Sequence, residues 1–239
     1  MKKLLFILMG LAALQSASAQ LTGGSLAEQF NNFVVNANTQ FNKAPLVDFV
    51  NVGGDKRFLS NKWIPGGVAN NYGYILSNGF TFNYDFMKQE LYARWKDTSI
   101  AVDPRAVSYF YMDTENGRKY FVKNLKLDGK GNNFYEAFAT ENPMKDSSQV
   151  QLLKYRTVKR IRANRNDYAA NFSGDYSDTY DNTEEYYLVF PDQTVTKVKL
   201  TKKSFQSAFD KAKVQADLSK LADSFNELGA ALFISQIRK

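Results

Sequence analysis

Carboxylates are the main acid–base groups that this chain offers, because its 239 residues include no Cys and no His. Glycoside hydrolysis needs two carboxylates held roughly 5–10 Å apart. Glu136 is one candidate, since it lies between Phe134 and Phe138 on one face of a predicted strand. Aromatic neighbours would raise the pKa of its carboxyl group, and they would also stack on a sugar. If Tyr135, Ala137 and Ala139 face the core instead, Glu136 points into water. The sequence does not identify a partner carboxylate.

The most distinctive charged segment is a basic run between residues 154 and 165. It contains six basic side chains and no acidic one, namely Lys154, Arg156, Lys159, Arg160, Arg162 and Arg165. Four of these share a face if the segment is a strand, and they are Lys154, Arg156, Arg160 and Arg162. Such a face would suit an anionic ligand, for example a lipid head group or an acidic glycan. The alternative is internal pairing between this strand and the acidic segment that follows it.

That following segment, residues 163–185, is predicted to be a long exposed loop, because Asn, Asp, Ser, Thr, Gly and Tyr dominate it. Its acidic residues include Asp175, Asp178, Asp181, Glu184 and Glu185. Clustered carboxylates suit Ca²⁺, but this spacing does not match a calcium-binding loop. We therefore predict no metal and no cofactor. The tyrosines of the loop, Tyr168, Tyr176 and Tyr180, offer an alternative role as a recognition surface.

Other enzyme classes find little support in the sequence. Without Cys and His, the chain has no thiol nucleophile, no Cys-ligated metal site and no Ser-His-Asp triad. It also contains no Gly-x-Ser-x-Gly or Ser-x-x-Lys motif, and its glycine pairs lack the spacing of a phosphate-binding loop. The aromatic content of 15% argues against disorder and for a substantial core.

The first 19 residues are predicted to be a cleaved export signal. Lys2 and Lys3 form a basic start, and residues 4–14 are almost entirely apolar. Small residues at 17–19 then match a signal-peptidase site. The apolar stretch is too short to span a bilayer, which takes about 20 residues. We therefore expect cleavage after Ala19, a location in the periplasm or cell envelope, and no transmembrane segment in the mature chain.

Strand patterns dominate residues 45–200. In the clearest of them, aromatic side chains alternate with polar ones at Phe80, Phe82, Tyr84 and Phe86. The preceding Asn78-Gly79 pair is typical of a two-residue hairpin turn, which would join this strand to residues 74–77. Further strands are predicted at 46–51, 90–95, 107–112, 119–123, 134–140, 150–161, 185–190 and 194–200. Their spacing, with no helical pattern between them, favours an antiparallel meander.

Helical patterns flank this β-rich domain. Residues 20–44 are predicted to be an N-terminal helical segment, because Ser25 and Glu28 have the spacing of a capping box. Residues 201–239 are predicted to be a C-terminal helical segment with Thr201 as its cap. Its apolar stripes are Phe205, Ala208, Phe209 and Ala212, followed by Leu218, Leu221, Ala222, Phe225 and Leu228. Gly229 separates the second stripe from a short apolar tail at 230–234, and one helix or two stays open.

The predicted fold class is therefore α+β. We expect a mostly antiparallel β-sheet or half-barrel, with an N-terminal helix and a C-terminal helix or helices. Four short blocks support a resemblance: Ser18-Ala19-Gln20, and residues 84–92, 185–189 and 202–205. With these blocks the chain resembles a broad group of uncharacterised exported proteins of Bacteroidota. The resemblance implies a β-rich periplasmic or surface protein, and it supplies no catalytic residue.

The functional prediction is a non-catalytic binding or structural protein of the periplasm or cell envelope. Its partner is expected to be another envelope protein or an anionic envelope component, and not nucleic acid. The alternative is a carboxylate-dependent hydrolase acting on envelope glycans. A concave pocket holding two carboxylates within about 10 Å would favour the hydrolase, whereas a flat basic or aromatic face would favour the binding protein.

Overall fold

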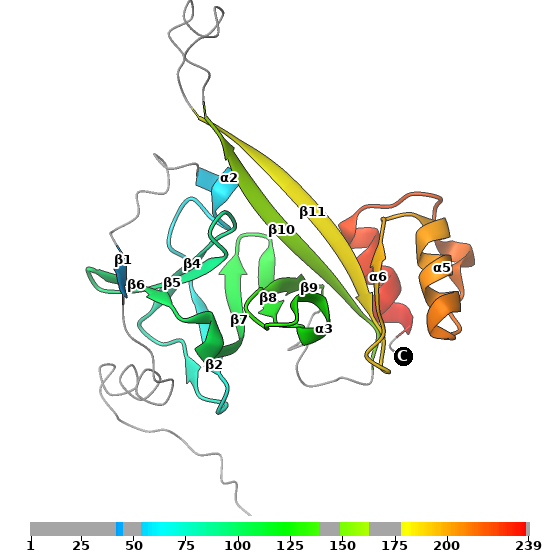
Figure 1. Ribbon diagram of the computed structural model, residues 1–239, viewed down its shortest axis with the longest axis horizontal. Coiled ribbons are helices and arrows are strands. Elements are labelled where there is room, and N and C mark those ends of the chain that lie inside the picture. Colours follow the sequence, from blue (N-terminus) through cyan, green and yellow to red (C-terminus); the bar gives the residue numbers. More distant parts are fainter. Residues whose placement is uncertain (1–41, 45–53, 139–148, 163–177, 238–239) are drawn as a thin grey trace, which may run out of the picture.

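The computed structural model describes residues 42–44, 54–138, 149–162 and 178–237, which form two open antiparallel sheets with helices towards the C-terminus (Figure 1). The strands are β1 (Asn42–Ala44), β2 (Gly66–Asn70), β3 (Ile75–Leu76), β4 (Thr81–Asp85), β5 (Glu90–Trp95), β6 (Thr98–Val102), β7 (Val107–Thr114), β8 (Gly117–Val122), β9 (Tyr135–Ala137), β10 (Gln151–Ile161), β11 (Thr179–Val189) and β12 (Val195–Val198). The helices are α2 (Gly54–Arg57), α3 (Leu125–Asp128), α5 (Lys202–Ala212) and α6 (Glu227–Ile237), with short 3-10 turns η1 (Pro104–Ala106) and η2 (Leu218–Lys220). The expected α+β class is confirmed.

The larger sheet has eight strands in the order β12-β11-β10-β9-β8-β7-β2-β3, and the smaller has four in the order β1-β6-β5-β4. The chain leaves the large sheet after β3, builds β4, β5 and β6, and returns to the large sheet at β7. Residues 42–44, expected in the N-terminal helical segment, instead form β1 and pair with β6. The export signal, the rest of that segment and the strand expected at 46–51 lie outside the described residues.

An aromatic core joins the two sheets. Tyr84 of the small sheet packs on Phe110 and Phe121 of the large one, with ring centroids 5.3 and 5.6 Å apart, respectively. Phe110 and Phe121 themselves stack at 4.6 Å. The aromatic side chains at 80, 82, 84 and 86 are all buried, as the alternation predicts. Burial of this much aromatic surface is the main stabilising term between the sheets.

The polar face of the same strand differs from the prediction. Asn83 and Asp85 are also completely buried, because residues that precede β2 cover them. Asn83 donates hydrogen bonds to the carbonyl oxygens of Ser60 and Lys62, at 2.7 and 3.1 Å. Asp85 pairs with Arg57 at the end of α2. These bonds satisfy polar groups that would otherwise be costly to bury.

The predicted hairpin around Asn78-Gly79 is wrong. The pair does form a turn, with Gly79 at a φ of 78° and a hydrogen bond from the Phe80 N–H to the Ser77 carbonyl. However, β3 pairs with β2, and β4 pairs with β5 in the other sheet. The turn therefore carries the chain from one sheet to the other, because packing of the aromatic face decides which strand β4 joins.

The exposed loop predicted at 163–185 is corrected at its C-terminal end. Residues 179–185 belong to β11, which pairs with β10 over its full length as a long two-stranded ribbon (Figure 1). The register places Arg156 opposite Glu184 and Lys159 opposite Asp181. Opposite charges across an antiparallel pair are favourable, and Thr and Tyr suit a strand. Residues 163–177 lie outside the described part of the chain.

The C-terminal segment contains two α-helices. Thr201 caps α5 by accepting a hydrogen bond from the Ser204 N–H, as predicted. The second predicted stripe is wrong as a helix, because residues 218–226 form only a 3-10 turn and irregular structure. α6 begins at Glu227 and runs through Gly229, so the apolar tail at 230–234 is helical. Both helices pack on β10, β11 and β12 through a second core that includes Leu188, Phe205, Phe209 and Phe233. None of the described helices is long and apolar enough to cross a membrane.

Candidate functional site

One row of side chains crosses the whole large sheet on its inner face. In strand order from β3 to β12 it reads Leu76, Val68, Phe110, Phe121, Glu136, Lys154, Tyr186 and Val198. The small sheet covers the apolar side chains at one end, and α5 and α6 cover those at the other. The charged pair in the middle therefore marks the junction between the two cores.

At this junction five charged side chains form what we call the ion network: Lys119, Glu136, Lys154, Glu184 and Glu227. The Lys154 ammonium lies 2.8 Å from a Glu227 carboxylate oxygen and 3.6 Å from an oxygen of both Glu136 and Glu184. Lys119 pairs with the other oxygen of Glu136 at 2.7 Å. Lys154 and Glu136 have side chains only 8% and 9% exposed. Each buried charge is costly to remove from water, and the opposite charge beside it offsets that cost.

The ion network also favours the charged forms of Lys154 and Glu227. Burial acts to lower the pKa of Lys154, but the surrounding carboxylates outweigh it, and the pKa lies above its usual value. Partial burial acts to raise the pKa of Glu227, yet hydrogen bonds from Lys154 and the Tyr186 hydroxyl bring it below its usual value. That hydroxyl donates to Glu227 at 2.6 Å. Both Lys154 and Glu227 are therefore charged near neutral pH.

The start of α6 positions Glu227. The side chain of Asn226 accepts a hydrogen bond from the Gly229 N–H at 2.9 Å, as an N-cap residue does. Glu227 then occupies the first turn, where a negative charge is favoured by the helix dipole. The helix end is thus tied to the sheet through Glu227 and Lys154, 73 residues apart in the chain.

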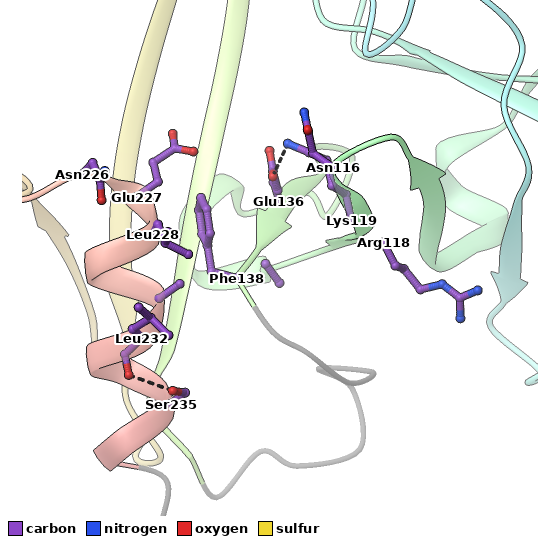
Figure 2. Close-up of a pocket in the computed structure, with 12 residues that line it drawn as sticks. Asn116, Arg118, Lys119, Glu136, Phe138, Asn226, Glu227, Leu228, Leu232 and Ser235 are labelled. Atoms are coloured by element: carbon purple, nitrogen blue, oxygen red, sulfur yellow. Dashed lines mark hydrogen bonds and ion pairs between the residues drawn. The ribbon is translucent and has the colours of Figure 1, made fainter.

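A pocket of about 760 Å³ opens beside the ion network, between β8–β9 and α6; we call it the α6 pocket. Figure 2 shows the polar side chains of Lys119, Glu136 and Glu227 at one end of this pocket. Its apolar lining comes from Phe138, Leu228, Ala231 and Leu232. This volume lies within the range of roughly 300–1,000 Å³ found for small-molecule sites. An apolar wall with a few convergent polar groups is the usual composition of such sites.

The sequence-derived candidate Glu136 thus lies in a pocket, although not as an isolated carboxyl among aromatic rings. It is buried, and Tyr135 and Ala137 on the opposite face of β9 are buried as well. Glu136 and Glu227 both contact the Lys154 ammonium, at 3.6 and 2.8 Å, so two carboxylates lie close together in this pocket, as the carboxylate pair of a glycosidase does. Glu227 is the partner carboxylate that the sequence did not identify.

The four residues of the predicted anionic-ligand face lie in different surroundings. Lys154 is enclosed by carboxylates, and Arg156 donates to the Lys56 carbonyl and lies over the Phe86 ring. Arg160 pairs with Asp178 towards the far end of the ribbon. Arg162 follows the last residue of β10 and is exposed. Two residues of the basic run thus have an ion-pair partner in the acidic segment, Arg160 with Asp178 and Lys154 with Glu184.

Other sequence candidates do not converge on a site. Among the described residues no group of three or more acidic side chains is arranged to hold a metal ion. Asp175, Tyr168 and Tyr176 lie outside the described part of the chain, and Tyr180 packs at the edge of the core between the sheets. Reasoning from sequence also missed Lys119, for which no local pattern gives a signal. The Asn226-Glu227 pair before an apolar run was the one available sign of a helix start.

Comparisons with known proteins leave the site to be interpreted from its own geometry. The chain matches no protein-family model, no curated protein and no solved structure.

Proposed function

We propose that the protein is a non-catalytic binding protein, exported to the periplasm or cell envelope, and that the α6 pocket holds its ligand. The observation that carries this proposal is the pocket itself, which is lined by leucines of α6 and by charged side chains of the large sheet. Leu228 and Leu232 are 66% and 54% exposed and lie one helical turn apart on the wall of the cavity. An apolar ligand group placed there would remove this surface from water.

The ion network supports binding over catalysis. A glycosidase needs one carboxyl that holds a proton near neutral pH. The pKa of Glu227 is shifted in the opposite direction, because Lys154 and Tyr186 stabilise its charged form. Glu136 lies between two ammonium groups, at 2.7 Å from Lys119 and 3.6 Å from Lys154. Both carboxylates therefore serve as ion-pair partners that fix the pocket wall.

A fluorescence assay tests the proposal with N-phenyl-1-naphthylamine, a neutral apolar probe that brightens on leaving water. We expect the purified protein to bind the probe, and Leu232→Lys to abolish binding by placing a charge on the apolar wall. Leu125→Lys is the matched control, since Leu125 is 68% exposed on α3 and does not line the pocket. Equal binding by both variants, or none by the unmodified protein, would remove the pocket as the ligand site.

The second candidate is a carboxylate-dependent hydrolase acting on envelope glycans. It is favoured by the shared contact of Glu136 and Glu227 with Lys154, which holds two carboxylates close together in one pocket. Incubation with purified envelope glycans, followed by measurement of new reducing ends, separates the two candidates. We expect no release by the unmodified protein. Release that is lost in both Glu136→Gln and Glu227→Gln would establish the hydrolase instead.

A further inference from the structure

The α6 pocket is polar at one end and apolar along its length. Figure 2 shows Glu227 and Lys119 from opposite walls at the same end, while Leu228 and Leu232 follow one another along α6. The first residue of α6, Glu227, therefore lies at the charged end, and Leu228 and Leu232 supply the apolar wall from there along the helix. A ligand that matches this order has a charged head and an apolar tail.

Two of the charged side chains at that end are open to a ligand. Lys119 is 29% exposed and Glu227 is 35% exposed, whereas Glu136 and Lys154 are below 10%. Each accessible side chain is paired with one of the buried ones. Lys119 lies 2.7 Å from Glu136, and Glu227 lies 2.8 Å from Lys154. Arg118 also lines the pocket, but it pairs with Asp113 and points away from Glu227 in Figure 2. A head group at this end would therefore meet one ammonium and one carboxylate together.

A head with a single charge fits this arrangement poorly. A carboxylate head that approaches Lys119 also approaches Glu136, which already accepts a hydrogen bond from that lysine. An ammonium head that approaches Glu227 also approaches Lys154, which already donates a hydrogen bond to one oxygen of that carboxylate. Like-charge contacts of this kind oppose binding, so a head with both charges is favoured over either alone.

Resting on the function proposed above, we propose that the ligand of the α6 pocket carries a zwitterionic head on an apolar tail, with the head between Lys119 and Glu227 and the tail along Leu228 and Leu232. The negative group of the head pairs with Lys119, and its positive group pairs with Glu227. The tail covers two exposed leucines and reaches Phe138 on the facing wall. Two sources share this chemistry: an apolar α-amino acid and a phospholipid with an ethanolamine head.

The test compares three compounds with closely similar tails by isothermal titration calorimetry. They are 2-aminodecanoate, which is zwitterionic, decanoate, which is anionic, and decylamine, which is cationic. We expect 2-aminodecanoate to bind roughly tenfold more tightly than either of the others, because it forms one additional charge-assisted hydrogen bond. Titration with lysophosphatidylethanolamine separates the two sources, since the tighter of the two zwitterions identifies the natural head group.

Two pocket variants and one control assign the preference to residues. Glu227→Gln is expected to reduce 2-aminodecanoate binding to the level of decanoate, and Lys119→Gln to reduce it to the level of decylamine. Glu115→Gln should keep the full preference, because Glu115 is exposed, pairs with Lys62 and lies outside the pocket lining. The preference is a ratio measured within each variant, so a modest loss of stability does not obscure it.

Failure of the inference differs from failure of the proposed function. Binding of all three compounds with similar affinity, lost in Leu232→Lys, would overturn the zwitterionic head and leave the pocket as a binding site. Tighter binding of decanoate or decylamine would do the same. No binding of any compound by the folded protein, or binding unaffected by Leu232→Lys, would overturn both.

Discussion

Replacement of Lys154 by Met is the change that most severely tests the ion network. The side chain is 8% exposed, and its ammonium is within 3.6 Å of three carboxylates, those of Glu136, Glu184 and Glu227. Met has a similar length and fills the same space without a charge. The substitution therefore removes the cation while preserving the packing of β10, and it leaves the carboxylates facing one another.

The expected loss in the free energy of unfolding depends on which partners each carboxylate keeps once Lys154 is removed. Breaking a buried ion pair on one side costs roughly 3–5 kcal/mol. Glu136 keeps Lys119 at 2.7 Å, and Glu227 is about a third exposed and keeps the Tyr186 hydroxyl. We therefore expect Lys154→Met to lower the free energy of unfolding by about 2–3 kcal/mol, below that range. Urea denaturation at pH 7 measures it.

The pH dependence of the stability difference between the unmodified protein and Lys154→Met provides a second test. Because the folded state lowers the pKa of Glu227, its stabilising contribution is present above the usual value of 4.5 and disappears as the pH falls through the folded pKa. In Lys154→Met the part of this contribution that Lys154 supplies is absent at every pH, while the Tyr186 hydroxyl still stabilises the charged form of Glu227. The difference in stability between the two proteins should therefore shrink from pH 7 towards pH 3. A cost below about 1 kcal/mol, as for a surface pair, or a difference that grows on acidification would refute the reasoning.

Three further substitutions test the scaffold by the same urea assay. Asp85→Asn should lower the free energy of unfolding by about 3 kcal/mol, because Arg57 loses its buried partner; no loss would contradict the buried pair. Gly66→Ala should cost at least about 2 kcal/mol, since a Cβ would lie 2.3 Å from the Tyr111 carbonyl oxygen, and a neutral result would mean that β2 and β7 are not so close. Arg160→Ser should change stability by less than about 1 kcal/mol, because its ion pair is half exposed, and a larger loss would show that the ribbon depends on it.

Local patterns predicted most elements of this fold but not their partners. The alternation at 80–86 correctly placed four aromatic side chains in the core, since side-chain direction in a strand follows directly from sequence spacing. The Asn78-Gly79 turn was also correct as a turn. Its role was not, because turn chemistry acts over four residues, whereas the sheet that β4 joins is decided by packing of whole faces.

The ribbon of β10 and β11 shows where a prediction from amino-acid composition fails. Residues 179–185 are almost entirely polar, which favours a loop when each segment is considered alone. They form a strand because the basic residues of β10 lie opposite them in register, so the pairing stabilises both segments. The prediction that the basic run pairs with the acidic segment after it included this pairing, but not the register that places the charges opposite one another.

The candidate site was predictable only in part. Glu136 could be recognised from its aromatic neighbours, and the register of β9 against β10 then gives its contact with Lys154. Nothing near Lys154 in the sequence shows that it is buried, since the cover comes from Glu227, 73 residues further along the chain. Sites assembled from a sheet and a distant helix lie beyond local patterns for this reason.

The central claim is that the α6 pocket binds an apolar ligand group, and methyl NMR spectroscopy tests it most directly. The protein is labelled at leucine methyl groups and titrated with N-phenyl-1-naphthylamine. We predict saturable shifts of the Leu228 and Leu232 methyl signals, while those of Leu125 stay fixed. Unchanged signals from both α6 leucines at saturating probe, or equal shifts at Leu125, would contradict the claim.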